Sequence, residues 1–292
     1  MGSKVPLTEK TRFFGILGNP VKESLSPRMH NAALRHLGID ALYVPYEITE
    51  PELRRVVRAM PALRFRGMNV TVPFKEKVIR YLDEVSEEAR QAGAVNAISV
   101  EKGRLVGHNT DGAGFVTALK AEGGISVRGE KVLLLGAGGP AKPIAMHMIR
   151  QGADRICVAN RTRSRAMALR RGLLRHFPDA DVAVSQLQGA AFREEVASCQ
   201  FIVNTTSVGM KKGDPSLVPP RWMSSSHVVV DIVYKPLRTP LIRSAEKAGA
   251  RFLNGLGMLL YQGAIAFRLW TGKSAPVDVM KRALRSAPQI RS

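Results

Sequence analysis

The sequence predicts an α/β protein of two domains, one of which carries a parallel nucleotide-binding sheet. Three observations lead to this prediction. A regular alternation of strand and helix patterns begins at Lys131, and a glycine-rich loop follows its first strand. Before that point, short apolar runs also alternate with helical patterns. Strands that alternate with helices form parallel sheets covered on both faces, and 292 residues are enough for two such domains.

The first part of the chain has the pattern of a smaller α/β domain. Ser26 and Pro27 are expected to open a helix as N-cap and first helical residue, because serine accepts from the first turn and proline suits that position. Strict alternation over 68–74 predicts a strand that turns Val70 and Val72 to the core. The expected elements are strands at 13–18, 41–48 and 68–74, helices from Ser26, from near Pro51 and over 83–92, and a hairpin of 94–100 with 105–106.

From Lys131 onward, strands and helices follow one another as in a doubly wound sheet. The expected strands lie at 132–135, 155–159, near Val182, at 201–204 and at 228–233. The tail from Gly255 is expected to be helical to the end of the chain.

A glycine loop joins the first of these strands to the next helix. Residues 135–141 read Leu-Gly-Ala-Gly-Gly-Pro-Ala, which is the spacing GxGxxA directly after a strand and before a helix. Gly136 allows a tight turn, Gly138 lets a pyrophosphate approach the backbone, and Ala141 permits close packing of helix and sheet. The helix N-terminus offers N–H groups and a positive dipole end to phosphates. This context predicts a dinucleotide site.

The end of the next strand indicates which dinucleotide binds. An NAD site usually holds the ribose hydroxyls with an acidic residue about 20 residues after the glycines. The corresponding segment is Asn160-Arg161-Thr162-Arg163-Ser164-Arg165, which contains no carboxylate. Arginines there could surround the 2′-phosphate of NADP, whose charge a carboxylate would repel. We therefore expect NADP, with a solvated basic turn as the alternative.

Two polar segments are candidates for chemistry. Asn69 and Thr71 share one face of the expected strand, and Lys75 follows where α/β clefts commonly open. The segment 109–112, Asn-Thr-Asp-Gly, precedes a helix that its Thr or Asp could cap. From the pattern alone, an exposed strand face and a helix cap remain open explanations.

The composition favours a cytoplasmic protein without a metal. Hydrophobic residues make up 45% and charged residues 23%, and no apolar run approaches the length of a membrane-spanning helix. Met1–Pro6 lacks the apolar core of a signal peptide. Cys157 and Cys199 lie in apolar, strand-like runs and are expected to be buried, reduced thiols. The six histidines show no spacing typical of metal ligands.

The net charge of +20 is the unusual feature of the composition. It favours an anionic partner, either nucleic acid or a phosphorylated, carboxylated small molecule. Basic residues are enriched only over 161–175, and the sequence contains no recognisable nucleic-acid-binding module. We expect a small-molecule substrate, no nucleic acid, no membrane, and a monomer or homodimer.

Eight short motifs occur in order along nearly the whole chain. They are Ser24-Leu25-Ser26-Pro27 with His30-Asn31, Asn69-Val70-Thr71 with Pro73 and Lys75, Gly93-Ala94-Val95-Asn96, Asn109-Thr110-Asp111-Gly112, Gly136-Ala137-Gly138-Gly139, Asn160-Arg161-Thr162, Asp231-Ile232-Val233-Tyr234 with Pro236, and Gly257-Met258-Leu259 with Gln262-Gly263-Ala264. Together they resemble the shikimate dehydrogenase family, of which the quinate/shikimate dehydrogenases are close relatives.

The resemblance implies a fold and an activity. The fold is an N-terminal α/β substrate domain plus a Rossmann-like NADP-binding domain, with the active site in the cleft between them. The implied bounds are 1–112 for the substrate-binding and catalytic domain, 113–250 for the NADP-binding domain, and 251–292 for C-terminal helices that return to the substrate domain. The activity is the NADPH-dependent, reversible reduction of 3-dehydroshikimate to shikimate, in the biosynthesis of chorismate and aromatic amino acids.

The resemblance also implies residue roles. Lys75 and Asp111 would be the catalytic pair, because hydride transfer needs a proton moved to or from the substrate oxygen. Asn69, Asn96 and Gln262, with Asp111, would hold ring hydroxyls. The residues implied for the substrate carboxylate are Ser24, Ser26, Thr71 and Tyr234. Those implied for the cofactor are Gly136, Ala137, Gly138, Gly139, Asn160, Arg161, Thr162, Arg165, Gly255 and Met258.

The chain departs from the family pattern at four positions. Pro140 is expected at the first helical position, where it removes one N–H that a phosphate could use, and Pro143 is expected to strain the first turn. Ala97 follows Asn96, and Phe74 precedes Lys75, where the family commonly has Thr and His; both change the expected pocket wall.

Two alternatives stay open. A relative acting on quinate, or on both quinate and shikimate, with NAD or NADP, would differ by accommodating one more hydroxyl beside the substrate carboxylate. A ligand-binding regulator without turnover would use the +20 charge for nucleic acid. The presence of both Lys75 and Asp111 argues against the regulator, because a binding protein does not need a proton-transfer pair.

Overall fold

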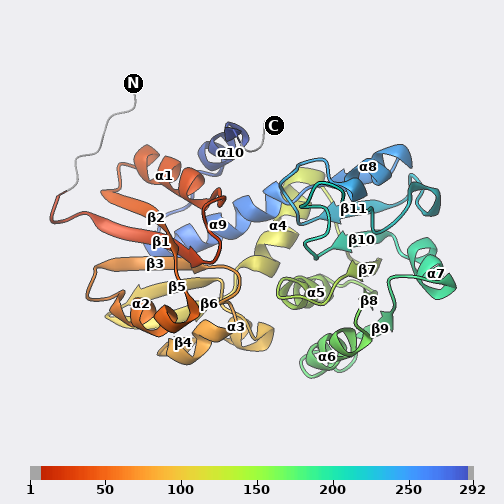
Figure 1. Cartoon of the computed structure of the whole chain (residues 1–292), viewed down its shortest axis with the longest axis horizontal. Helices are drawn as coiled ribbons and strands as arrows, with labels where there is room; N and C mark the ends of the chain where they lie inside the picture. Colours follow the sequence, from red (N-terminus) through yellow and green to blue (C-terminus); the bar gives the residue numbers. More distant parts are fainter. Residues whose placement is uncertain (1–7, 289–292) are drawn as a thin grey trace. The chain divides into compact units, whose positions relative to one another are not determined.

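The computed structural model describes residues 8–288, in two compact units (Figure 1). Unit 1 is the described chain up to Thr110 together with the part from Leu260 onward, and unit 2 is Asp111–Leu259. The segment Met1–Pro6, considered above for a targeting signal, lies outside the described residues, as do the last four positions of the tail.

Unit 1 contains a six-stranded mixed sheet in the order β2-β1-β3-β5-β6-β4. β1 pairs in parallel with β2 and β3, β5 pairs antiparallel with β3 and β6, and β4 pairs in parallel with β6. The elements are β1 (Arg12–Gly18), α1 (Ser26–His36), β2 (Ala41–Glu47), η1 (Glu50–Glu52), α2 (Leu53–Ala59), β3 (Phe65–Val70), η2 (Lys77–Tyr81), β4 (Glu84–Val85), α3 (Glu87–Ala92), β5 (Ala97–Glu101), β6 (Arg104–His108), α9 (Leu256–Thr271, whose first turn belongs to unit 2) and α10 (Val277–Arg285).

The C-terminal helices pack on the sheet of unit 1. Trp270 of α9 lies against Gly67 of β3, where a Cβ would overlap the indole ring. The indole Nε1 donates to the carbonyl of Ile98 in β5 over 2.9 Å, and α10 packs against α1. This half-buried tryptophan contacts two strands and so fixes the helix to the sheet, because aromatic side chains bury large apolar areas.

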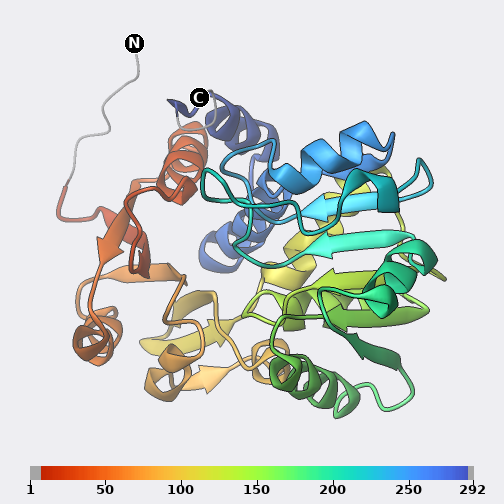
Figure 2. The ribbon, with the colours of Figure 1, turned by 45° about the vertical axis from the view of Figure 1, so that its right-hand side comes forward.

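Unit 2 contains a six-stranded parallel sheet in the order β12-β11-β10-β7-β8-β9 (Figure 2). Four of the five residues of its central strand β7 are buried, which is why they form a continuous apolar run. The elements are α4 (Asp111–Gly123), β7 (Lys131–Leu135), α5 (Ala141–Arg150), β8 (Arg155–Ala159), α6 (Arg163–Leu174), β9 (Asp181–Ser185), α7 (Ala190–Ser198), β10 (Phe201–Asn204), η3 (Pro220–Trp222), β11 (Val228–Asp231), α8 (Pro240–Lys247) and β12 (Arg251–Leu253).

The strand expected over 68–74 is displaced from β3, which is Phe65–Val70, and its inward face is wrong at one position. β3 ends at Val70, and Phe74 N donates to Thr71 O over 2.9 Å, so residues 71–74 form a turn. Val72 lies in this turn with 59% of its surface exposed, whereas Val70 is buried. The alternation of apolar and polar residues continues past the point where pairing with β1 stops, which is why the pattern misled.

Other element bounds also differ from expectation. The helix expected from Asp83 begins only at Glu87, after the cap Ser86, because residues 84–85 pair with β6 instead. α1 has Leu25 at its N-cap, so Ser26 is the first helical residue and not the cap. The last strand before α8 ends at Asp231. The tail is interrupted after Thr271 at Gly272, whose φ is +70°, before α10 begins.

Candidate active site

A buried cluster of amide side chains lies at one end of the unit 1 sheet. Asn69, Asn96, Thr110 and Gln262 are all at most 8% exposed. Nδ2 of Asn96 donates to Thr110 Oγ1 over 2.9 Å and to Gln262 Oε1 over 3.3 Å. Its Oδ1 accepts from the backbone N–H of Thr110 over 2.7 Å. The cluster therefore joins β3, the turn before β5, the residue before α4, and α9.

Tyr43 of β2 supports this cluster, although the sequence motifs do not include it. Its hydroxyl donates to Oδ1 of Asn69 over 2.7 Å, and Nδ2 of Asn69 donates to the carbonyl of Asn96 over 3.0 Å. Burial raises the pKa of Tyr43 well above its ordinary value, although a hydrogen bond with Ser26 opposes the rise. The phenol stays protonated and acts as a donor. In the sequence Tyr43 is one aromatic residue in a strand, which gives no signal that separates it from the core.

Ser24, Thr71 and Lys75 lie in turns that follow β1 and β3. These two strands are parallel with Leu17 opposite Val70, so their carboxyl ends meet at one edge. Thr71 N donates to Leu17 O over 2.9 Å. Ser24 Oγ accepts from the N–H of Ser26 over 3.3 Å, at the start of α1. The carbonyl of Lys75 accepts from Val95 N over 2.8 Å, which fixes the lysine backbone beside the segment of Asn96.

Asp111 and Tyr234 belong to unit 2, unlike the other residues expected to bind substrate. Asp111 is 4% exposed and is the first residue of α4, directly after Thr110. At the next residue, Gly112, a Cβ would overlap Pro143 O and the His147 ring, so α4 and α5 pack closely there. The glycine of this motif therefore serves helix packing beside the carboxylate.

The glycine loop of unit 2 has the geometry expected of a dinucleotide site. Gly136 has φ +104°, and a Cβ there would lie 2.6 Å from the methyl carbon of Thr206, so only glycine fits. A Cβ on Gly138 or Gly139 would meet no atom of the described residues within 4 Å, apart from its own chain neighbours. Ala141 is fully buried as the first residue of α5. The loop therefore presents open backbone, as a pyrophosphate requires.

Pro140 and Pro143 each occupy a helix position one earlier than expected. Pro140 is the N-cap of α5 and not its first helical residue. Pro143 is the third helical residue, where the N–H of any amino acid would lack an intrahelical acceptor. Pro143 therefore removes no backbone hydrogen bond from α5, so the strain expected in the first turn does not come from a lost hydrogen bond.

A cluster of arginines lies at the N-terminus of α6, after β8. Asn160 donates from Nδ2 to the carbonyl of Thr162, which is the N-cap of the helix, over 2.9 Å. Arg161 and Arg165 are exposed, and neither forms an ion pair with any residue in the range 8–288. The first turn of α6 has no acidic residue, although the helix dipole favours one there. The arrangement creates a positive field that suits a bound phosphate.

Gly255 and Met258 line a small cavity in unit 2, next to the end of β11. The cavity has a volume of about 10 Å³, close to the space for one water. A Cβ on Gly255 would overlap the carbonyl of Ile232, so the turn after β12 lies directly on the segment after β11. Tyr234 is two residues further along that segment.

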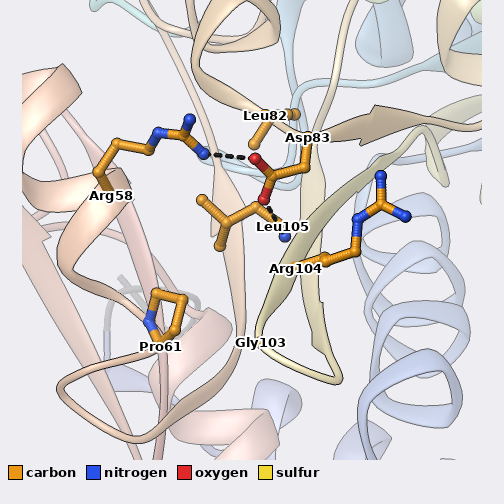
Figure 3. Close-up of a pocket in the computed structure, with 7 residues that line it drawn as sticks. All are labelled: Arg58, Pro61, Leu82, Asp83, Gly103, Arg104 and Leu105. Carbon is orange, nitrogen blue, oxygen red and sulfur yellow. Dashed lines mark hydrogen bonds and ion pairs between the residues drawn. The ribbon is translucent and has the colours of Figure 1, made fainter.

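A larger groove of unit 1, of about 710 Å³, contains none of the residues expected in the site (Figure 3). Asp83 lines it and accepts from Arg58 over 2.6 Å and from the N–H of Leu105 over 2.8 Å. The Leu105 N–H and then Arg58 hold the pKa of Asp83 below its ordinary value. This contact ties α2 to β6, and we assign it a structural role. The lining residues are Arg58, Pro61, Leu82, Asp83, Gly103, Arg104 and Leu105.

The two cysteines are buried thiols, and the described residues offer no cluster for a metal. Cys157 in β8 and Cys199 just before β10 form no disulfide. Burial raises the pKa of both thiols, that of Cys199 to about 11. Among residues 8–288, no group of three or more His, Cys, Asp or Glu side chains is placed to hold a metal ion. No helix in the same range is long and apolar enough to cross a membrane.

Models of known families match three parts of the chain. The substrate-binding domain of shikimate dehydrogenase matches residues 16–98, and the shikimate/quinate 5-dehydrogenase family matches residues 118–209. The C-terminal domain of shikimate 5′-dehydrogenase matches residues 255–285. The order of the matches agrees with the order of the motifs.

Curated relatives match over almost the whole chain. The shikimate dehydrogenase (NADP(+)) of Alkaliphilus oremlandii is 39% identical over 280 residues, which cover 95% of this chain and 98% of the relative. The enzyme of the same name from Moorella thermoacetica is 42% identical over 284 residues, covering 97% and 96%.

Solved structures share the fold of both units. A shikimate dehydrogenase in complex with NADP+ has a TM-score of 0.89 at 36% identity, covering 96% of each chain. The enzyme from Thermus thermophilus in complex with NADP(H) and shikimate has a TM-score of 0.84 at 38% identity, covering 94% of this chain and 99% of that one. A quinate dehydrogenase from Corynebacterium glutamicum in complex with NAD has a TM-score of 0.88 at 30% identity, covering 95% and 99%. The fold class and the resemblance inferred from the motifs are confirmed, and the chain belongs to the shikimate dehydrogenase family.

Proposed function

We propose that this chain catalyses the reversible reduction of 3-dehydroshikimate to shikimate with NADPH. The observation that carries the proposal is the buried amide cluster of unit 1, in which Asn69, Asn96 and Gln262 are oriented by hydrogen bonds. Preoriented amides select a ring that carries several hydroxyls, because a ligand without them would leave buried polar groups unpaired. The curated relatives named above carry the same activity in their names.

We assign the substrate to unit 1 and NADP to unit 2. The match of the substrate-binding domain to residues 16–98 supports the first assignment. The second is supported by the glycine loop at Gly136 and by the exposed Arg161 and Arg165, with no carboxylate in the turn at 160–165. Both arginines fit the 2′-phosphate, and the open backbone at Gly138 fits the pyrophosphate. When bound, the nicotinamide supplies or accepts the hydride.

Lys75 and Asp111 are the residues that we assign to proton transfer. Reduction of a ketone needs a proton at the carbonyl oxygen as the hydride arrives, and oxidation needs the same proton removed. In the direction of reduction, the Lys75 ammonium donates its proton to that oxygen. We assign Asp111 to a neighbouring ring hydroxyl, which it would orient before the reaction.

Hydroxyl groups are assigned to the substrate carboxylate. Ser24, Ser26 and Thr71 come from the segments that follow β1 and β3, and Tyr234 comes from the segment that follows β11. Hydroxyl donors bind an anion directionally but less strongly than an arginine does. This choice suits a substrate that must leave after each turnover.

The chain belongs to a family whose solved members include a quinate dehydrogenase, so quinate is the second candidate substrate. Quinate has one more hydroxyl on the carbon that carries the carboxylate. We propose shikimate because the relatives at about 40% identity are named for shikimate and NADP. We further propose a cytoplasmic location, which two buried thiols without a disulfide support, and a monomer or homodimer.

The experiment crosses two substrates with two cofactors. Purified protein is assayed for reduced nicotinamide by absorbance, with shikimate or quinate and with NADP or NAD. The proposal expects kcat/KM to be highest for shikimate with NADP. A higher value for quinate would make the chain a quinate dehydrogenase, and no turnover with any pair would favour a binding protein.

A further inference from the structure

Two polar residues, Asn204 and Asp231, lie side by side within an otherwise apolar sheet. They are the last residues of β10 and β11 and are paired in register, with Leu135 of β7 on the other side of Asn204. Both are 0% exposed. Burial of an ionisable group is costly unless hydrogen bonds compensate it. A carboxylate at this position therefore needs an explanation.

Asp231 is held by three neutral donors. Its Oδ1 accepts from Asn204 Nδ2 over 2.9 Å and from Val233 N over 3.0 Å. Its Oδ2 accepts from Thr239 Oγ1 over 2.6 Å. Burial raises the pKa of Asp231 to about 6, and the three hydrogen bonds oppose this rise. The side chain joins the end of β10 and the N-cap of α8 to the segment that follows β11.

Asn204 extends the contact toward the glycine loop. Its Oδ1 accepts from the N–H of Thr206 over 3.0 Å and from the Thr206 hydroxyl over 2.7 Å. The methyl carbon of Thr206 then lies 2.6 Å from the position of a Cβ on Gly136. The neighbouring Thr205 donates from both its N–H and its hydroxyl to Leu135 O, each over 2.9 Å. The segment after β10 therefore forms the wall behind Gly136.

Asp231 extends the contact in the other direction, toward Tyr234 and Gly255. Its bond from Val233 N fixes the residue directly before Tyr234. The carbonyl of Ile232 lies where a Cβ of Gly255 would be, so this segment also supports the turn after β12. One buried carboxylate is thus connected to the segment of Gly136 through Asn204 and Thr206, to that of Tyr234 through Val233, and to that of Gly255 through the neighbouring Ile232.

We propose that Asp231, acting through Asn204 and Thr206, is a positioning residue that sets the geometry of the glycine loop against the segments of Tyr234 and Gly255. The proposal rests on the function proposed above, in which unit 2 holds NADP. A buried carboxylate that only stabilised the sheet would not need partners both in the segment behind the glycine loop and directly before Tyr234. Misplacement of a binding group by about 1 Å can cost about a hundredfold in rate. Loss of Asp231 should therefore weaken cofactor binding beyond its effect on stability.

The first test compares Asp231→Asn with the matched change Asp181→Asn. Asp181 begins β9 of the same sheet, and its side chain is 63% exposed. NADPH binding is titrated by nicotinamide fluorescence without substrate, and unfolding is followed in parallel. Because the amide introduced by Asp231→Asn would direct N–H groups at existing donors, we expect the Kd for NADPH to rise at least about tenfold. Asp181→Asn is expected to bind as the wild type does.

A second pair of variants decides the question even if Asp231→Asn does not fold. Thr206→Val keeps the methyl group near Gly136 but removes the hydroxyl that donates to Asn204, whereas Thr206→Ser keeps the hydroxyl. We expect the valine variant to bind NADPH more weakly than the serine variant. In the valine variant, the KM for NADP should change more than kcat does. Equal Kd values for this pair, or normal binding in a less stable Asp231→Asn, would overturn the proposal.

The outcome also separates this proposal from the proposed function. Wild-type protein that binds NADPH but does not oxidise shikimate would contradict the function, while the variants would still decide the role of Asp231. Wild-type protein that binds neither NADPH nor NADP would overturn both. An active wild type with unchanged variants would overturn the positioning role alone.

Discussion

The hydroxyl of Tyr43 donates a buried 2.7 Å hydrogen bond to Oδ1 of Asn69. Nδ2 of Asn69 donates one of its hydrogens to the carbonyl of Asn96 over 3.0 Å. With its carbonyl oxygen oriented by Tyr43, Asn69 can offer a substrate oxygen its second Nδ2 hydrogen. In the function proposed above, Tyr43 therefore leaves Asn69 the role of a donor toward the substrate.

Replacement of Tyr43 with phenylalanine tests this relationship. Tyr43→Phe leaves the buried Oδ1 of Asn69 without its donor, at a cost of about 1–3 kcal/mol. We expect the KM for shikimate to rise roughly tenfold while the KM for NADP changes little. Tyr46→Phe, on the same strand but half-buried, is the control. An unchanged KM for shikimate would show that Asn69 does not need this orientation.

Lys75 is expected to be essential for turnover but not for binding. Loss of a general acid or base typically lowers the rate by about 10²–10⁴-fold. We expect this loss in kcat for Lys75→Ala, with shikimate still bound in a calorimetric titration. Lys77→Ala is the matched control, because Lys77 is a half-exposed lysine of η2 that pairs with Glu50. Turnover of Lys75→Ala within a few-fold of the wild type would refute the assignment.

The preference for NADP is expected to reside in Arg161 and Arg165. A charge-assisted hydrogen bond contributes about 1.5–3 kcal/mol, or roughly tenfold to a hundredfold in affinity. The double variant Arg161→Ser/Arg165→Ser should therefore raise the KM for NADP by at least about tenfold and that for NAD much less. Arg171→Ser, in the last turn of α6, controls for the loss of positive charge. An equal rise in KM for NADP and for NAD would show that the two arginines do not act on the 2′-phosphate.

His30 is expected to make the fold sensitive to acid. The side chain is 1% exposed and stacks on Tyr43 with 4.4 Å between ring centres, and neither ring nitrogen has a hydrogen-bond partner among residues 8–288. Burial lowers its pKa from 6.5 to about 3. Because the folded-state pKa lies below the unfolded value, neutral His30 contributes its full stabilisation of the fold at pH values above the unfolded pKa. It is lost as the pH falls toward the folded pKa.

Replacement of His30 by phenylalanine should remove this sensitivity. Phenylalanine keeps the stacking and has no group to protonate, so His30→Phe should lose less stability between neutral and acidic pH. The difference is on the order of 5 kcal/mol at most. Urea unfolding at a series of pH values measures it, and His36→Phe, an exposed position on the same helix, is the control. Parallel pH profiles for wild type and His30→Phe would contradict the expectation.

The glycine loop could be predicted from the sequence because its signals are local. The strand, the turn at Gly136 and the packing residue Ala141 follow one another within seven residues, and the φ of +104° at Gly136 agrees with the reason given for glycine there. The turn that contains Val72 was missed because the interaction that ends the strand before it is not local. Where β3 stops pairing depends on β1, which lies far away in the sequence.

The sequence pattern could not show which residues support one another in the site, although Asn69 itself was a candidate. Tyr43 and Asn69 are 26 residues apart, and Asn204 and Asp231 are 27 apart. Each member stands in a short strand whose neighbours are apolar, so the pattern around it is that of a core strand. Only the pairing of the strands brings the polar members together. An isolated polar residue at the end of an apolar run is the signal that could have marked Asn204 and Asp231.

The high positive charge is expected to serve no functional nucleic-acid binding. The net charge is +20, and its one dense stretch, residues 161–175, begins at the arginines assigned to the 2′-phosphate. Within that stretch Arg170 is already engaged, since its Nε donates to Val182 O over 2.7 Å. Counterion release alone still gives a non-specific Kd of roughly 10⁻⁴–10⁻⁶ M for such a protein. Competition at physiological salt is therefore the informative measurement. Duplex DNA or RNA should neither displace NADPH nor slow shikimate oxidation beyond the effect of ionic strength, and tight, sequence-selective binding would instead support the regulator.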